Sequence, residues 1–210
     1  MREKYGLKFS NGDGSLLMEI GPHVVREMPK FSEKIGEIAI AWAQAEVHLN
    51  CLFAVLLDVT PEAAASELKR YKTAAKAMEG ARIIAAEHLA GEELQNFNGI
   101  LDRMNSLRSR RNRIQHDIWA RKGGVDDRLY AVHANQYLHV VARMLELTES
   151  QLAESEKADR IISLGNEFTG EISASVTLND LTVFECELAE VSKDLMSAMF
   201  VRLLVRKENR

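Results

Sequence analysis

The sequence predicts a mostly α-helical protein: a helical bundle with a small irregular or β-hairpin insertion and a long C-terminal helix. Apolar residues recur at intervals of three and four through most of the chain beyond residue 31, the spacing of one helix face. Charged residues make up 28% of the chain and there are three prolines, a composition that favours helices. With 210 residues and 46% hydrophobic content, the chain can bury a substantial core. We expect one domain at residues 31–210, preceded by an arm at residues 1–30.

The expected N-terminal arm should be irregular or contain short strands. It carries the turn cluster Asn-Gly-Asp-Gly at residues 11–14 and two prolines, Pro22 and Pro29. From Phe31 the pattern becomes helical, and this first helix should end near Asp58. Its apolar stripe comprises Ile35, Ile38, Trp42, Ala45, Leu49, Leu52 and Leu56.

A second helix is expected to start at Thr60 and Pro61. Thr60 would be the N-cap, and Pro61 would take the first helical position, where its missing N–H does no harm. The helix should stop before Gly91, and residues 71–73 could interrupt it.

The third helix should start at Glu92 and continue to about Ile118, which completes the motif-bearing segment 31–121. The pair Gly123-Gly124 then breaks the helix, and the residues that follow it alternate between polar and apolar in the manner of a strand. This pattern predicts a small hairpin within residues 122–147.

Two capping-box patterns predict helices in the C-terminal segment, residues 148–210. Thr148-x-x-Gln151 should open a helix that ends near Leu164, and Thr177-x-x-Asp180 should open the last one. The last helix carries an apolar stripe suited to closing the bundle or a dimer: Leu181, Phe184, Leu188, Val191, Leu195, Met199 and Leu203.

Charge and cysteine usage indicate the compartment and the kind of partner. The net charge is −4, so any nucleic-acid contact must come from a local patch rather than from a global field. Cys51 and Cys186 lie among apolar helix residues, and we expect them to be buried free thiols. The N-terminus lacks the apolar core of a signal peptide, and we expect no membrane span and a cytoplasmic location.

An arginine cluster, defined as Arg108, Arg110, Arg111 and Arg113, lies in the third expected helix. Arg111 falls on the helix's apolar stripe, which otherwise comprises Leu101, Met104, Leu107, Ile114 and Ile118. An unpaired charge in an apolar position is costly, so a carboxylate or a bound anion should meet Arg111. Glu46, at the edge of the first helix's apolar face, is a candidate structural partner.

The pattern Arg111-Asn112-x-x-x-His116 resembles the signature of the HEPN superfamily, in which an Arg, commonly followed by a polar residue, precedes a His by four to six positions. The resemblance covers roughly residues 31–121. It implies a HEPN-like helical bundle and a metal-independent endoribonuclease whose active site is formed by two copies of the motif across a homodimer. It also implies a toxin or defence effector with a cognate antitoxin protein as partner.

The residues of the motif suit RNA cleavage by the substrate's own 2′-hydroxyl. His116 would act as general acid and base, and Arg111 would neutralise the phosphate in the transition state. Asn112 would orient or bind the phosphate. Arg108, Arg110 and Arg113 are candidate contacts to the RNA backbone, or else an ordinary solvated face. We expect no cofactor and no metal, because the other histidines lack metal-ligand spacing.

Helix geometry predicts a composite site. On an ideal helix, Arg111 and His116 lie roughly 140° apart, so one copy does not aim both at one phosphate, whereas two antiparallel copies would. The alternative is a catalytically inactive helical module for dimerisation or protein interaction. In that case Arg111 and Glu46 form an internal ion pair and His116 has no catalytic role.

Overall fold

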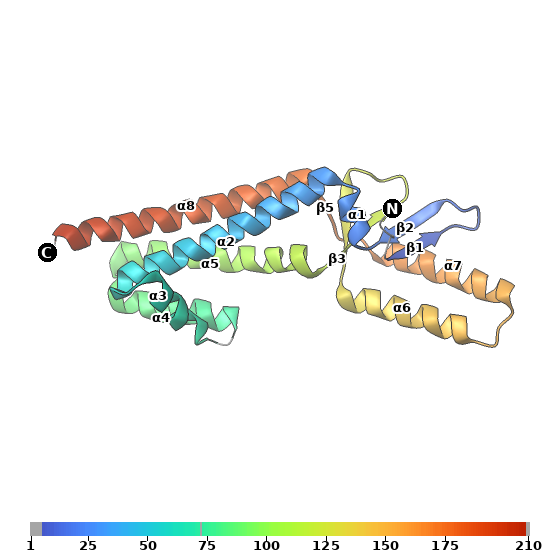
Figure 1. Ribbon diagram of the computed structural model, residues 1–210, viewed down its shortest axis with the longest axis horizontal. Coiled ribbons are helices and arrows are strands. Elements are labelled where there is room, and N and C mark those ends of the chain that lie inside the picture. The colour runs from blue at the N-terminus through green and yellow to red at the C-terminus, as the bar shows by residue number, and fades with distance from the viewer. Residues whose placement is uncertain (1–5, 72, 209–210) are drawn as a thin grey trace. The chain divides into compact units, whose positions relative to one another are not determined.

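The computed structural model describes residues 6–71 and 73–208 and confirms a mostly α-helical fold (Figure 1). It divides the chain into two compact units, each made of segments distant in the sequence. The sheet unit comprises Met1–Ile35 and Asn112–Thr182, and the helical unit comprises Gly36–Arg111 and Val183–Arg210.

The sheet unit is built on a five-stranded antiparallel sheet with strand order β1-β2-β3-β4-β5. The strands are β1 (Leu7–Ser10), β2 (Leu16–Ile20), β3 (Ile118–Lys122), β4 (Arg128–Val132) and β5 (Ser175–Thr177). The expected N-terminal arm therefore supplies two strands, and β2 pairs with β3 about a hundred residues later, with Ile20 opposite Ala120. Pairing between such distant segments leaves no local sequence signal.

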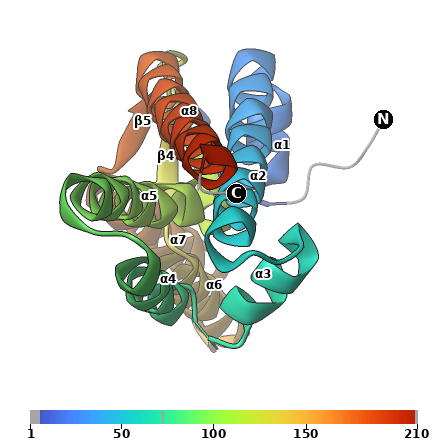
Figure 2. The same ribbon diagram turned by 90° about the vertical axis from the view of Figure 1, so that its left-hand side faces the viewer.

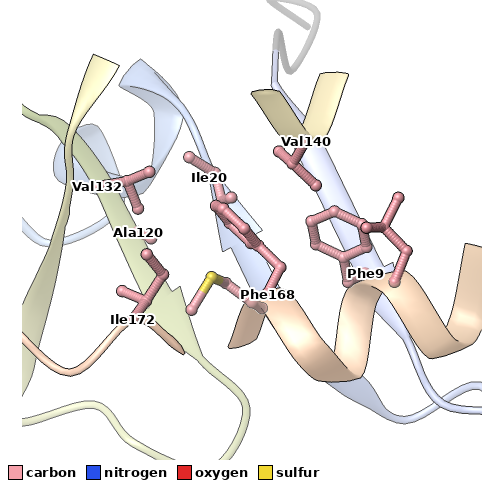
Figure 3. Packing of buried hydrophobic residues seen from close by; sticks show 9 residues of the cluster. Phe9, Ile20, Ala120, Val132, Val140, Phe168 and Ile172 are labelled. Atoms are coloured by element: carbon pink, nitrogen blue, oxygen red, sulfur yellow. The ribbon is translucent and has the colours of Figure 1, made fainter. Parts of the chain in front are cut away.

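The sheet unit also contains the helices α1 (Pro22–Arg26), α6 (Ala134–Glu149) and α7 (Glu154–Glu171). Helix α7 packs against α6 and against strands β1 and β2. Figure 3 shows the core between them, where the Phe9 and Phe168 ring centroids lie 5.9 Å apart. Gly165 makes this contact possible, since a Cβ there would lie 2.7 Å from Cδ1 of Phe9.

The helical unit is formed by α3 (Pro61–Lys69), α4 (Ala74–His88) and the greater part of α2 (Pro29–Leu57), α5 (Gly91–His116) and α8 (Leu178–Glu208). Figure 2 shows α2, α5 and α8 packed together, with α3 and α4 on the side away from α8. The rings of Phe53 on α2 and Phe97 on α5 meet edge to face, with centroids 5.6 Å apart.

Helix starts in the structure follow the expected capping chemistry in two places. The Thr60 hydroxyl accepts a hydrogen bond from the Ala63 amide at 3.3 Å, with Pro61 at the first helical position. At the start of α8, the Thr177 amide donates to the Asp180 carboxylate at 2.8 Å, and the Asp180 amide donates to the Thr177 hydroxyl at 3.2 Å. The expected interruption of the second helix is also confirmed, because α3 ends before residue 71 and α4 begins after it.

The predicted hairpin was too long, and the predicted start of the following helix was wrong. Strands β3 and β4 form the hairpin, but residues from 134 onward are helix α6, whose N-cap is His133. Thr148 lies in the last turn of α6, where its hydroxyl donates to the carbonyl of Met144 at 2.8 Å instead of capping a helix. A threonine hydroxyl can bond back along a helix as readily as it can cap one, so the spacing alone was misleading.

The expectation that both cysteines are buried was also wrong. Cys51 is half-buried and Cys186 is exposed, although both are free. The apolar stripe of α8 is buried up to Leu195, whereas Leu203 near its C-terminal end is exposed.

Helix α2 is long and apolar enough to cross a membrane by length and composition alone. Most of its apolar stripe is nevertheless buried in the helical unit, where Trp42, Leu49 and Leu52 are all buried. A core helix of a water-soluble unit meets the same length and composition criteria, so this feature is weak evidence for a membrane span.

Candidate nuclease site

The motif lies in the last two turns of α5. Arg111 is half-buried, and its guanidinium lies over the ring of Trp42 with 5.8 Å to the centroid. Trp42 is only 4% exposed, so this aromatic surface is fixed by the core of the helical unit. A cation–π contact with Trp42 therefore helps to stabilise the charge of Arg111 at an apolar position of the helix. The sequence did not indicate this contact.

Asn112 and His116 belong to the sheet unit and lie one helical turn apart on α5. Asn112 is half-buried, and His116 is exposed at the final residue of the helix. Residues at this separation on a helix present neighbouring side chains.

Two arginines of the cluster are paired with carboxylates. Arg110 forms an ion pair with Glu187 on α8 and stacks on Phe184, with 4.5 Å from its guanidinium carbon to the ring centroid. Arg113 pairs with Asp117 at 3.5 Å, one turn further along the chain. These contacts neutralise the charge of two arginines that were candidates either for binding an RNA backbone or for an ordinary solvated face.

Arg108 differs from these two arginines. Its guanidinium donates two hydrogen bonds, of 3.0 and 3.2 Å, to the side-chain oxygen of Asn105, which is a neutral amide. Arg108 also lines a cavity of about 380 Å³ that is bounded by α2, α3, α4 and α5, and which we call the α2–α5 cavity. Glu46, the expected partner of Arg111, is exposed and lines the same cavity.

A buried ionic network in the sheet unit was missed by sequence reasoning. Glu19 on β2 and His23 on α1 are 5% and 4% exposed, and their side chains lie 3.0 Å apart. Arg121 on β3 donates to the Glu19 carboxylate at 2.6 and 3.0 Å and to Glu27 at 2.8 Å. Burial lowers the pKa of Arg121, but the hydrogen bonds and charges of the two glutamates outweigh this effect, and the net pKa is raised.

A second contact missed from the sequence joins α2 to α8 within the helical unit. The hydroxyl of Ser192, a buried residue, lies 2.7 Å from Nδ1 of His48. The same nitrogen is 3.2 Å from the Ser192 carbonyl oxygen. These residues are 144 positions apart, so no spacing rule could have paired them.

No group of three or more His, Cys, Asp or Glu side chains that could hold a metal ion is found within residues 6–71 and 73–208. In comparisons with protein-family models, with curated proteins and with solved structures, no match to this chain was found.

Proposed function

We propose that this protein is a metal-independent endoribonuclease of HEPN type, with an active site assembled from two copies of the chain. The observation that carries the proposal is the Arg111-Asn112-x-x-x-His116 motif at the end of α5, with His116 exposed and one turn from Asn112. A general acid or base must reach its substrate, so exposure of the imidazole is a requirement that the motif meets.

Each motif residue has a distinct part in the reaction. One His116 imidazole takes the proton of the RNA 2′-hydroxyl, whose oxygen attacks the adjacent phosphorus. The bond from phosphorus to the 5′-oxygen breaks, and the second copy's imidazolium protonates the leaving oxygen. The products are a 2′,3′-cyclic phosphate and a 5′-hydroxyl end. Asn112 orients the phosphate.

Arg111 acts as the cation that neutralises charge on the phosphate. Its stacking on Trp42 supports this role, because a guanidinium held against a buried ring loses little conformational freedom when it binds an anion.

Within the arginine cluster, Arg108 is the main residue that contacts the RNA backbone. The ion pairs of Arg110 with Glu187 and of Arg113 with Asp117 would have to open before either guanidinium could bind a phosphate. Arg108 is hydrogen-bonded to a neutral amide and keeps its charge available.

In a cell, such an activity would suit a toxin or defence effector in the cytoplasm whose partners are RNA and a cognate antitoxin protein.

A direct test is incubation of the purified protein with a pool of cellular RNA, with and without a chelator. We expect cleavage to continue in chelator and to leave 2′,3′-cyclic phosphate ends, detectable because they resist a phosphatase that removes ordinary 3′-phosphates. Activity that is lost in chelator and restored by magnesium would contradict the mechanism.

The second candidate is a catalytically inactive module for dimerisation or protein interaction. The observation in its favour is that Arg110 and Arg113 are paired with acidic side chains of the same chain, which is what structural arginines do. This candidate predicts no cleavage of any RNA under either condition.

A further inference from the structure

The α2–α5 cavity is lined by both apolar and polar side chains. Its volume of about 380 Å³ falls within the range of roughly 300–1,000 Å³ that is typical of small-molecule sites. The apolar lining includes Leu49, Leu68, Met78 and Met104, and the polar lining includes Glu46, Asn50, Lys69 and Arg108. Two cations and one carboxylate leave the lining with a positive balance, which favours an anionic ligand.

Arg108 indicates which anion the cavity binds, namely a phosphate. Its neighbours in the cluster, Arg110 and Arg113, are paired with carboxylates, whereas Arg108 is held by the Asn105 amide. An amide orients a guanidinium without neutralising it, so Arg108 retains donors and charge for a phosphate.

The N-terminal end of α4 adds to the positive potential at the cavity. Thr73, the N-cap of this 15-residue helix, lines the cavity. The partial positive charge of a helix N-terminus would act together with Lys69 and Arg108 on a bound anion.

Aromatic side chains also line the cavity. Tyr71 follows α3 and packs against Gly80 of α4, where an added Cβ would lie 2.0 Å from the Cζ atom of the Tyr71 ring. Gly80 thus leaves room for the ring in its observed position. Trp42 lines the cavity and is also the residue over which the Arg111 guanidinium lies, so one side chain contacts both the cavity and the arginine of the motif.

We infer that the α2–α5 cavity binds one unstacked nucleotide, with its base against Tyr71 and the methionines and its phosphate at Arg108 and Lys69. That this nucleotide belongs to an RNA strand rests on the proposed function. Aromatic and apolar side chains receive a base whatever its identity, and a guanidinium binds phosphate with two parallel hydrogen bonds. The site would select single-stranded RNA, because a base within a duplex cannot enter a cavity.

The inference can be tested by calorimetric titration of the full chain with UMP and AMP, with the matching nucleosides, and with inorganic phosphate. We expect both nucleotides to bind, and the nucleosides and phosphate alone to bind at least about tenfold more weakly. Arg108→Gln should weaken nucleotide binding about tenfold or more, which corresponds to about 1.4 kcal/mol for one lost phosphate contact.

The matched control is Arg103→Gln, on the same helix. Arg103 pairs with Asp194 and does not line the cavity, so nucleotide binding should be unchanged. Gly80→Ala should displace the Tyr71 ring and reduce nucleotide binding toward that of phosphate alone. If Arg108→Gln does not fold, Lys69→Gln, on an exposed residue, tests the same phosphate contact.

Nucleotide binding and RNA cleavage are separate measurements, so the two proposals can fail separately. The cavity assignment is overturned if neither nucleotide binds at millimolar concentration, if nucleosides or phosphate bind equally well, or if Arg108→Gln binds nucleotide as Arg103→Gln does. Nucleotide binding without cleavage of any RNA would support the cavity and overturn the ribonuclease. Cleavage by a protein that fails the nucleotide titration would overturn the cavity alone.

Discussion

At the scale of single residues, the motif divides into a structural part and an accessible part. Arg111 contacts Trp42 in the core of the helical unit, whereas His116 is exposed at the end of α5. The two residues should therefore respond differently to replacement by alanine, in both stability and cleavage.

His116→Ala should separate catalysis from folding. The side chain is exposed, so the free energy of unfolding should change by roughly 1 kcal/mol or less. Cleavage should fall by about 100-fold or more, the scale expected for the loss of a general acid or base. Denaturant titration and a cleavage assay on the same preparation measure both quantities.

Arg111→Ala should lower both the free energy of unfolding and the rate of RNA cleavage. Loss of the contact with Trp42 should cost about 1–2 kcal/mol of stability, and cleavage should fall because the phosphate loses its cation. If His116→Ala cleaves RNA as well as the parent while Arg111→Ala only loses stability, the motif is a structural site and the ribonuclease proposal is wrong.

Gly165 offers a test of packing in the sheet unit. Gly165→Ala would place a methyl group against the Phe9 ring and should destabilise the protein by about 1–3 kcal/mol through overpacking. Gly170→Ala, in the same helix, is the matched control because its Cβ would meet nothing within 4 Å. The control should be neutral or stabilising by up to about 1 kcal/mol. Equal thermal melting temperatures for the two variants would contradict this account.

At the scale of elements, the sheet unit depends on a charged contact between neighbouring strands. Arg121 on β3 and Glu19 on β2 are directly paired in the strand register, and their side chains hydrogen-bond to each other. This ion pair therefore stabilises the pairing of β2, in the N-terminal hairpin, with β3, in the hairpin that follows α5.

Arg121→Ala should destabilise the protein by about 3 kcal/mol, the lower end of the range for breaking a buried ion pair, because the buried Glu19 carboxylate loses this partner while His23 stays 3.0 Å away. The control is Arg128→Ala on β4, whose partner Asp127 is an exposed neighbour in sequence, so its melting temperature should match the parent's. A similar small effect for both variants would show that the pair of Glu19 with Arg121 contributes little.

At the scale of the whole molecule, the proposed mechanism requires two copies of the chain. Positions 111 and 116 lie roughly 140° apart on an ideal helix, so one phosphate would be reached by residues from both copies. A two-fold axis brings identical motifs together, because an isologous contact places the same surface on both sides.

We therefore expect a stable homodimer with the motif-bearing end of α5 in the interface. Sedimentation should show a dimer at micromolar concentration. In a variant with both natural cysteines replaced by serine, a single cysteine at the exposed position Gln115 should cross-link two chains, whereas one at exposed Ile83 on α4 should not. A stable monomer at that concentration would exclude the composite site.

The sequence by itself determined the helices of the helical unit, but it predicted most of α6 as part of a hairpin and misplaced both ends of α7. Apolar residues at intervals of three and four marked α2 and α5, and Thr60 with Pro61 and Thr177 with Asp180 marked two helix starts. These patterns predict helices because the backbone hydrogen bonds, the capping contacts and the apolar spacing of a helix all involve residues a few positions apart in the sequence.

Only the tertiary structure decided which residues meet across long separations. It placed Arg111 on Trp42, paired Arg110 with Glu187, and joined Glu19 to Arg121 across two hairpins. The physical reason is that a charge can be satisfied by a ring, an amide or any of several carboxylates, and local spacing does not distinguish among them. The partner of each charged side chain is decided when the chain packs, because packing determines which groups come within hydrogen-bonding distance of it.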